Sequence, residues 1–274
     1  MPSEAQIAEL VSLLDETREQ LAYYKELGAT GAEKFVAPAS VVEDQPAQFA
    51  HPVAVDGIRP HVSASSPTSD SLFGDLSAPP VRIPKSTESF EEIWADVGNC
   101  TRCPLHQGRT NIVHTDGNRK ARLMFVGEAP GADEDAQARP FVGRAGQLLT
   151  KIIEAIGLKR EEVLIGNVNR CRPPGNRPPT PEEASMCKPF LLREIAVVQP
   201  EVIVVLGNTA MRNLLDIKQG ITRVRGQFQD YHGVKVMPTF HPAYLLRDPS
   251  KKKETWEDLK KVRDYLDANR KPAS

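Results

Sequence analysis

The chain has 274 residues and a net charge of −1 at pH 7, but its charges are unevenly distributed. Residues 1–85 carry 6 Lys and Arg against 12 Asp and Glu, whereas residues 86–274 carry 29 against 24. A basic region behind an acidic leader suits a polyanionic ligand. The sequence shows neither a signal peptide nor an apolar run long enough to cross a bilayer, so we expect a cytoplasmic protein with no membrane partner.

Composition and periodicity divide the chain into three predicted regions. Residues 1–28 begin with a capping box at Ser3 and carry apolar residues on one face, which predicts an amphipathic helix that could bind a protein partner. Residues 29–85 are rich in Pro, Ala and Ser without a sustained period, which predicts a disordered linker. We expect residues 86–274 to form the functional domain, and the protein to be a monomer.

Four apolar stretches in this domain predict buried strands. Helical patterns lie between them, among them 146–156 and a capped helix from Pro181 to Val198. This alternation predicts a three-layer α/β/α domain with a mainly parallel central sheet of about four strands. The predicted strands are 123–126, 162–168, 202–206 and 234–240.

The stretch after the first predicted strand, 127–149, consists of a loop rich in glycine and acidic residues and the start of the predicted helix 146–156. A strand, a glycine-rich turn and a helix place backbone N–H groups at the carboxyl end of a parallel sheet, where α/β folds bind ligands. Phe141 is the large apolar residue in the polar part of this loop. Such a side chain needs a flat partner, which could be the core or a ligand ring.

The chain has four cysteines, of which Cys100 and Cys103 form a C-x-x-C pair and Cys171 and Cys187 stand apart. Two disulfides, a zinc site and an iron–sulfur cluster are the three interpretations. A cytoplasmic location argues against disulfides. Structural zinc usually uses two close pairs, so the spacing favours a cluster only slightly over zinc.

Two stretches of this domain resemble a known family. The segments G-E-A-P-G-A-D-E-D (127–135) and R-P-F-V-G-R-A-G-Q-L-L (139–149) are similar to the signature of the family 4 (iron–sulfur) uracil-DNA glycosylases. The resemblance extends from about Phe90 to the C-terminus. It implies a uracil-DNA glycosylase fold and a DNA repair enzyme that hydrolyses the N-glycosidic bond of deoxyuridine in single- or double-stranded DNA, leaving an abasic site.

The resemblance also implies a cofactor and site residues. All four cysteines match the ligands of the family's 4Fe-4S cluster. An asparagine at a strand end can match the O4 and N3–H edge of uracil, and a histidine can stabilise the departing base. The implied uracil-binding residues are Gly127, Glu128, Ala129, Phe141, Asn167 and His241. The implied catalytic residues are Glu128, Glu134, Asn176 and His241. The residues expected to contact DNA are Arg144, Leu245, Leu246 and Arg247.

The sequence departs from the expected pattern at two positions. Ala129 stands where better-known uracil glycosylases carry a water-activating aspartate, which directs attention to Glu128 and Glu134. Ala138 stands where the family generally has glycine. If the backbone there has a positive φ, alanine costs about 1 kcal/mol.

Two other functions are compatible with these residues. One is a binding module of the same fold that holds uracil or a DNA end without cutting. The other is a zinc-containing hydrolase that acts on a nucleotide.

Overall fold

The computed structural model describes residues 82–270. The predicted helix 1–28 and nearly all of the predicted linker lie outside the described residues. Within 82–270, no helix has the length and apolar character needed to cross a membrane.

The core of the domain is one six-stranded sheet in the order β1-β3-β2-β4-β6-β5. The four central strands are parallel, and the two short edge strands are antiparallel to their neighbours. The predicted α/β fold is therefore confirmed, and the predicted four strands are the central ones. The strands are β1 (Asp116–Gly117), β2 (Leu123–Gly127), β3 (Leu164–Asn167), β4 (Val202–Leu206), β5 (Gln229–Tyr231) and β6 (Val234–Thr239).

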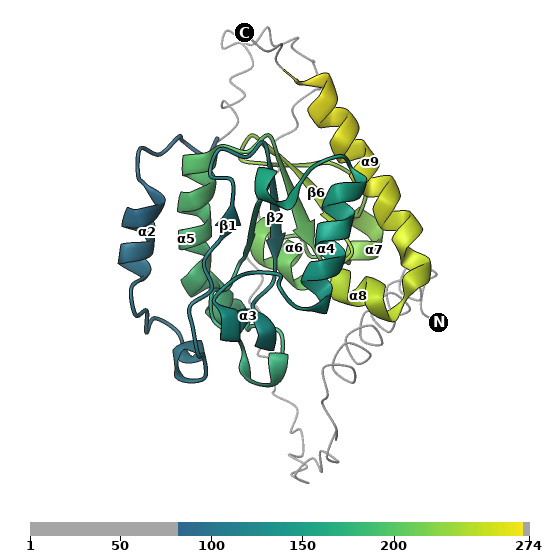
Figure 1. Cartoon of the computed structure of the whole chain (residues 1–274). Helices are drawn as coiled ribbons and strands as arrows, with labels where there is room; N and C mark the ends of the chain where they lie inside the picture. Colours follow the sequence, from purple (N-terminus) through teal and green to yellow (C-terminus); the bar gives the residue numbers. More distant parts are fainter. Residues whose placement is uncertain (1–81, 271–274) are drawn as a thin grey trace, which may run out of the picture. The chain divides into compact units, whose positions relative to one another are not determined.

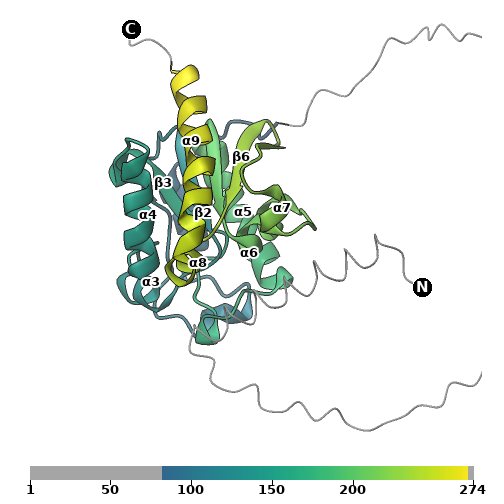
Figure 2. The same ribbon diagram turned by 90° about the vertical axis from the view of Figure 1, so that its right-hand side faces the viewer.

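Helices cover both faces of this sheet, which makes three layers (Figures 1 and 2). Leu123 and Phe125 of β2 pack with α4 (Arg144–Ala155) and α9 (Lys252–Ala268), whereas Met124 and Val126 pack with helices of the opposite face. Strands buried on both faces are continuously apolar, which is why β2 and β4 lack a polar–apolar alternation. The helices of the opposite face are α2 (Phe90–Val97), α5 (Pro181–Val198), α6 (Asn208–Leu215) and α7 (Ile221–Val224).

Side-chain caps set the starts of two helices. Ser89 and Glu92 form a capping box at α2, and Thr180 and Glu183 form one at α5. The predicted span of α5, Pro181 to Val198, is confirmed. It could be predicted because the capping residues, the proline after the cap and the end of the helix are all local features of the sequence. The predicted helix 146–156 is observed as α4, which begins two residues earlier, after Gly143.

The loop between β2 and α4 contains a short helix that the sequence analysis did not predict, α3 (Ala132–Gln137). The buried Asp135 carboxylate anchors it by accepting bonds from the backbone N–H groups of Thr110 (2.9 Å) and Asn111 (3.1 Å). These residues follow the Cys100–Cys103 segment, so that segment and the glycine-rich loop are tied together. Ala138 ends α3 in the left-handed region, with φ 54° and ψ 26°.

Replacing Ala138 by glycine is therefore expected to stabilise the protein. Glycine adopts this φ without a Cβ clash, and the strain that it relieves is about 1 kcal/mol. We expect Ala138→Gly to raise the melting temperature.

Gly175→Ala is the matched control, since Gly175 has φ +63° and a Cβ there would meet nothing within 4 Å. This change adds a side chain at a positive φ without a steric clash and is expected to lower the melting temperature. A lower melting temperature for Ala138→Gly would show that strain at this position is not significant.

Candidate active site

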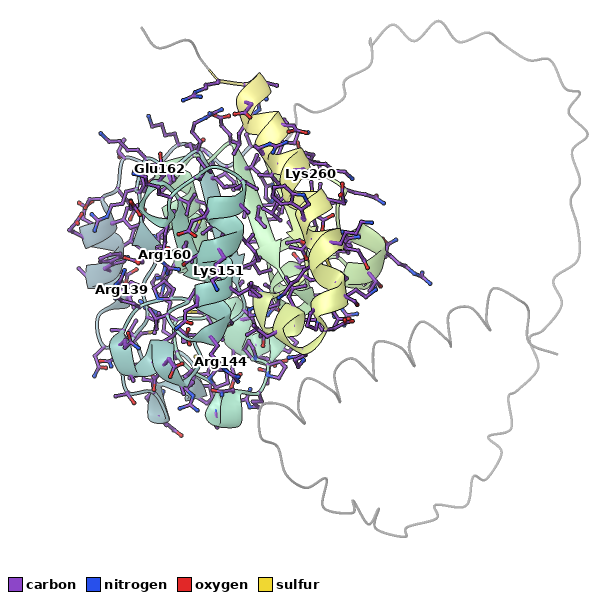
Figure 3. The ribbon with its side chains drawn as sticks, turned by 45° about the vertical axis from the view of Figure 1, so that its right-hand side comes forward. Arg139, Arg144, Lys151, Arg160, Glu162 and Lys260 are labelled. Carbon is purple, nitrogen blue, oxygen red and sulfur yellow. The ribbon has the colours of Figure 1, made fainter. Side chains whose placement is uncertain are left out.

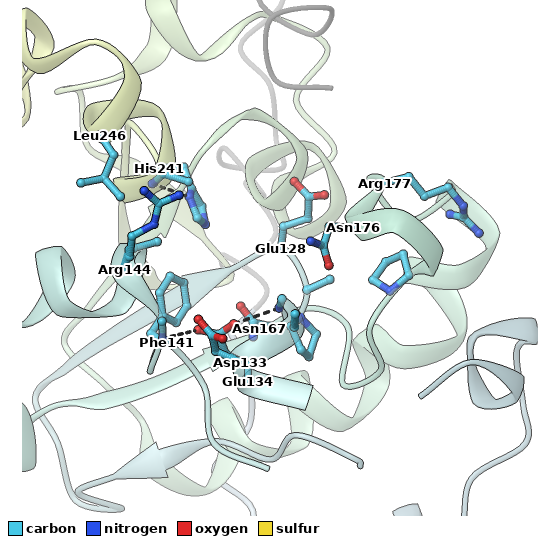
Figure 4. A pocket seen from close by; sticks show the side chains of 18 of the residues that line it. Glu128, Asp133, Glu134, Phe141, Arg144, Asn167, Asn176, Arg177, His241 and Leu246 are labelled. Atoms are coloured by element: carbon cyan, nitrogen blue, oxygen red, sulfur yellow. Dashed lines mark hydrogen bonds between the residues drawn. The ribbon is translucent and has the colours of Figure 1, made fainter. Parts of the chain in front are cut away.

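A cavity of about 350 Å³ opens at the carboxyl edge of the central sheet. Its walls come from the loop after β2, the end of β3, the loop 173–177 and the segment after β6. In Figure 4, His241 and Phe141 lie on one side of this cavity and Glu128 and Asn176 on the other. Elements far apart in the sequence thus meet where parallel α/β sheets bind ligands.

Phe141 has an unusual backbone conformation, with φ +53°, and its side chain is only 6% exposed. The Glu134 carboxylate holds the turn that follows it. One oxygen of Glu134 accepts bonds from the N–H groups of Val142 and Gly143, both at 2.9 Å, and the other accepts from Gly131 N–H at 3.1 Å. Both carboxylate oxygens are therefore occupied by backbone.

Gly146 and Gly127 make room for Phe141. A Cβ on Gly146 would lie 1.8 Å from the Phe141 carbonyl oxygen, so α4 can approach this turn only with glycine there. A Cβ on Gly127 would lie 2.4 Å from the edge of the Phe141 ring and 2.5 Å from Asn167 Oδ1. The absence of a side chain at Gly127 lets the ring and the amide stand next to each other.

Asn167 ends β3 and presents its amide to the cavity (Figure 4). The side chain is 6% exposed, and its Oδ1 is buried without a hydrogen-bond partner among the described residues. An unpaired buried acceptor is costly, and in native proteins most are paired. An N–H group of a ligand that reaches this oxygen would therefore satisfy it.

His241 begins α8 (Pro242–Arg247) as its N-cap. Its Nδ1 accepts a bond from the Ala243 backbone N–H at 3.1 Å, so the proton of the neutral ring resides on Nε2. Burial, together with the nearby Arg247 cation, lowers the pKa of His241 to about 4. The ring lies 5.7 Å from the Phe141 ring, between centroids. The site therefore contains a neutral imidazole that can donate one hydrogen bond.

Glu128 and Asn176 form part of the opposite wall. Burial raises the pKa of Glu128 to about 7, although a hydrogen bond from Thr209 opposes this rise. Asn176 has φ +55°, and its Oδ1 accepts a bond from Arg172 Nε at 2.6 Å. Ala129 also lines the cavity, next to Glu128.

The four residues predicted to contact DNA differ in whether they line the cavity or are buried in the core. Arg144, Leu246 and Arg247 line the cavity, and Leu246 is 41% exposed. Leu245 is 1% exposed and packs in the hydrophobic core, so the prediction that it contacts DNA is wrong. Neighbouring residues of a helix point in different directions, and α8 turns Leu245 towards the sheet.

Two charged residues that line the cavity, Asp133 and Arg177, were not among the predicted site residues. Asp133 lies close enough to Gly143 that a Cβ there would be 2.5 Å from its Oδ2. Arg177 lines the cavity and forms two bonds with the buried Glu183 carboxylate, at 2.7 and 2.8 Å. The only signal for Asp133 was its place in the acidic run, and Arg177 could have been noted from its place beside Asn176.

The four cysteines line a second cavity, together with Arg109 and Phe190. All four thiols are free. Arg109 donates to Cys171 Sγ and the backbone N–H of Arg170 to Cys187 Sγ, both at 3.3 Å.

Among the described residues, no three His, Cys, Asp or Glu side chains are grouped to hold a single metal ion. Four thiols that line one cavity supply the type and number of donors that a cubane cluster uses. Burial raises the pKa of the Cys187 thiol to about 12, so a metal has to displace its proton on binding.

The fold and the cavity define an α/β protein that can bind a flat, uncharged ring between an aromatic side chain and an amide. The family model described as "Uracil DNA glycosylase superfamily" matches residues 114–260. The type-4 uracil-DNA glycosylase of Thermotoga maritima is 49% identical over 183 residues, which cover 65% of this chain and 95% of that protein. The type-4 uracil-DNA glycosylase of Archaeoglobus fulgidus is 45% identical, over 64% of this chain and 92% of that protein. The chain belongs to the type-4 family of the uracil-DNA glycosylase superfamily.

The structure predicts a specific protonation state for His241. In NMR spectra of the ¹⁵N-histidine-labelled protein, we expect a neutral ring with its proton on Nε2 at pH 7 and a midpoint near pH 4. Since this pKa lies below the ordinary value of 6.5, protonation opposes folding, and stability should be lost as the pH falls from about 6.5 towards 4.

The His241→Asn variant assigns the signal, which should be missing from its spectrum. A ring that titrates near its ordinary pKa, or that carries its proton on Nδ1, would contradict the geometry.

Proposed function

We infer that this chain is a DNA repair glycosylase that excises uracil from DNA by hydrolysing its N-glycosidic bond, leaving an abasic site. Membership of the type-4 family supports this activity. The observation that carries it is the buried, unpaired Oδ1 of Asn167 beside the Phe141 ring. A pyrimidine with an N–H at its Watson–Crick edge satisfies this oxygen, and uracil has one at N3.

Base recognition follows from the amide and the ring. Uracil, turned out of the DNA, would stack on Phe141, with Asn167 Oδ1 accepting from N3–H and Nδ2 donating to O4. Cytosine has an acceptor at N3 and a donor at position 4, so the same amide orientation would meet it with two mismatched contacts. Leaving buried polar groups unpaired is an effective way to reject the wrong base.

His241 would assist departure of the base. As the glycosidic bond breaks, negative charge grows on uracil, and a donor at Nε2 would stabilise it at O2. A neutral imidazole suffices, since a preorganised donor in a cavity shielded from water stabilises charge more than the same donor does in water. In this proposal the base therefore leaves as an anion held by the site.

The carboxylates would have different tasks. A pKa of about 7 keeps a substantial fraction of Glu128 ionised at neutral pH, and its carboxylate can position the attacking water or oppose the positive charge on the sugar. Asn176, on the same wall, is a candidate for holding that water. Because backbone N–H groups occupy both oxygens of Glu134, we assign it to positioning the Phe141 turn.

The mouth of the cavity suits DNA. Leu246 is an exposed apolar side chain that can fill the gap left by the extruded nucleotide. Arg144 and Arg247 stand beside it and can contact phosphates.

Cys100, Cys103, Cys171 and Cys187 are the proposed ligands of a 4Fe-4S cluster. When bound, the cluster would supply folding energy, and no step of the proposed reaction depends on it. It would fasten the segment before β1 to the loop after β3 and to α5. That loop carries Asn176, so the cysteine cavity also supports one wall of the site.

Several expectations stay predictions. These are the extent of the glycosylase domain at residues 86–274, the cytoplasmic monomer and a protein partner for residues 1–28.

Uracil excision by the purified full chain is the direct test. On DNA with a single uracil, we expect free uracil and an alkali-labile abasic site. Asn167→Ala should lower kcat/KM at least about 100-fold, because it removes the paired readout of the base. Asn269→Ala, at the exposed end of α9, serves as the control and should leave kcat/KM unchanged.

Two outcomes would count against the proposal. A wild-type chain that binds the DNA without cutting it would favour the binding-module alternative. An Asn167→Ala variant with wild-type activity would exclude the proposed recognition.

The cofactor has its own test. Wild-type protein should contain about four irons per chain. Cys187→Ala should lose iron and sulfide and melt at a lower temperature, whereas Ser185→Ala, an exposed residue of the same helix that does not line the cysteine cavity, should keep its iron and sulfide. Stoichiometric zinc without iron in the wild-type protein would instead support the zinc interpretation.

A further inference from the structure

Arg160 lies outside the cavity but contacts the chain next to Phe141. It begins the short 3₁₀ helix η2 (Arg160–Glu162) ahead of β3, and Figure 3 shows it beside α4. Its Nη2 donates to the Pro140 carbonyl oxygen at 2.7 Å, and its Nη1 donates to Thr150 Oγ1 at 3.2 Å. Both hydrogen bonds of this half-buried guanidinium therefore go to uncharged oxygens. Burying a cation costs free energy because the cation loses its hydration.

The Pro140 carbonyl is important because it belongs to the peptide unit that sets φ of Phe141. That φ is +53°, a value that bulky L-residues rarely adopt, so the surrounding structure has to impose it. On the C-terminal side, Glu134 fixes the N–H groups of Val142 and Gly143. On the N-terminal side, the hydrogen bond from Arg160 fixes the Pro140 peptide.

A second connection links Arg160 to the same turn. Thr150, which accepts the other bond of Arg160, donates in turn to the Gly146 carbonyl at 3.2 Å. Gly146 is the residue whose missing Cβ leaves space for the Phe141 carbonyl. Arg160 therefore joins the start of α4 to the segment that carries Phe141.

We propose that Arg160 is a positioning residue for uracil recognition: with Glu134, it holds the backbone of Phe141 from both sides so that the ring stays against the base. This proposal rests on the proposed function, because it assumes that Phe141 stacks on the base. Arg160 contacts neither the base nor the reacting atoms.

The test uses the full chain with its cofactor and measures two quantities, kcat/KM for excision and the inhibition constant of free uracil. Arg160→Gln should weaken inhibition by uracil about tenfold, as expected for losing hydrogen bonds from a charged group, and lower kcat/KM by a similar factor. Arg160→Lys keeps a cation that can reach Pro140, so it should recover part of both losses.

Arg122→Gln is the matched control. The guanidinium of Arg122 also bonds a backbone carbonyl, that of Leu266 at 2.6 Å, and it pairs with Glu201 away from the cavity. Its loss should lower the melting temperature while leaving inhibition by uracil unchanged. If Arg122→Gln weakened inhibition as much as Arg160→Gln, the effect would be one of general stability and the proposal would fail.

A double-mutant cycle with Phe141→Leu gives the decisive result. Leucine removes the flat ring, so Arg160→Gln should have little further effect on uracil inhibition in that background. Equal losses in both backgrounds would overturn the proposal. Weaker binding of Arg160→Gln to uracil-free DNA, with uracil inhibition intact, would overturn it in favour of a phosphate contact. A wild-type chain without excision activity would instead refute the proposed function itself.

Discussion

The site depends on one carboxylate that holds a strained turn. Glu134 accepts three backbone hydrogen bonds, from Gly131, Val142 and Gly143, and thereby joins the start of α3 to the turn after Phe141. Charge-assisted bonds to backbone N–H groups are among the stronger ones in proteins, and they offset the cost of a positive φ at a bulky residue. This bridge fixes the backbone N–H groups of the two residues that follow Phe141.

The electrostatics of the cavity suit a neutral base that becomes charged during reaction. His241 is neutral, and Asn167 offers an unpaired acceptor. Glu128 has a pKa of about 7, so this side chain is only partly ionised at neutral pH before the substrate enters. In the proposed function, the fixed donors and the Glu128 carboxylate meet charges only as they develop, which is how preorganised sites lower a barrier.

Much of the fold could be predicted because its signals are local. The continuous apolar runs of β2 and β4 identified buried strands, and the capping box at Thr180 fixed the start of α5. The short helix α3 was missed because its sequence, A-D-E-D-A-Q, has no apolar face. The edge strand β1 is two residues long, too short to show a period.

Residue roles within the site were harder to predict. Spacing does not reveal that Glu134 is committed to backbone N–H groups, because those groups converge only after the chain has turned at Phe141. Likewise, Leu245 and Leu246 are equivalent in the sequence, and only the packing of α8 on the core separates the buried residue from the exposed one. Arg160 gave no signal at all, since its contact with Pro140 spans 20 residues.

A crystal structure of the full chain with free uracil would test the proposed recognition of the base. We expect the base to stack on Phe141, with N3 about 3 Å from Asn167 Oδ1 and O2 facing Nε2 of His241. The Phe141 backbone should keep its positive φ, with Glu134 still bonded to Val142 and Gly143. Uracil bound away from the Phe141 ring, or an Asn167 Oδ1 paired with the protein instead of the base, would contradict it.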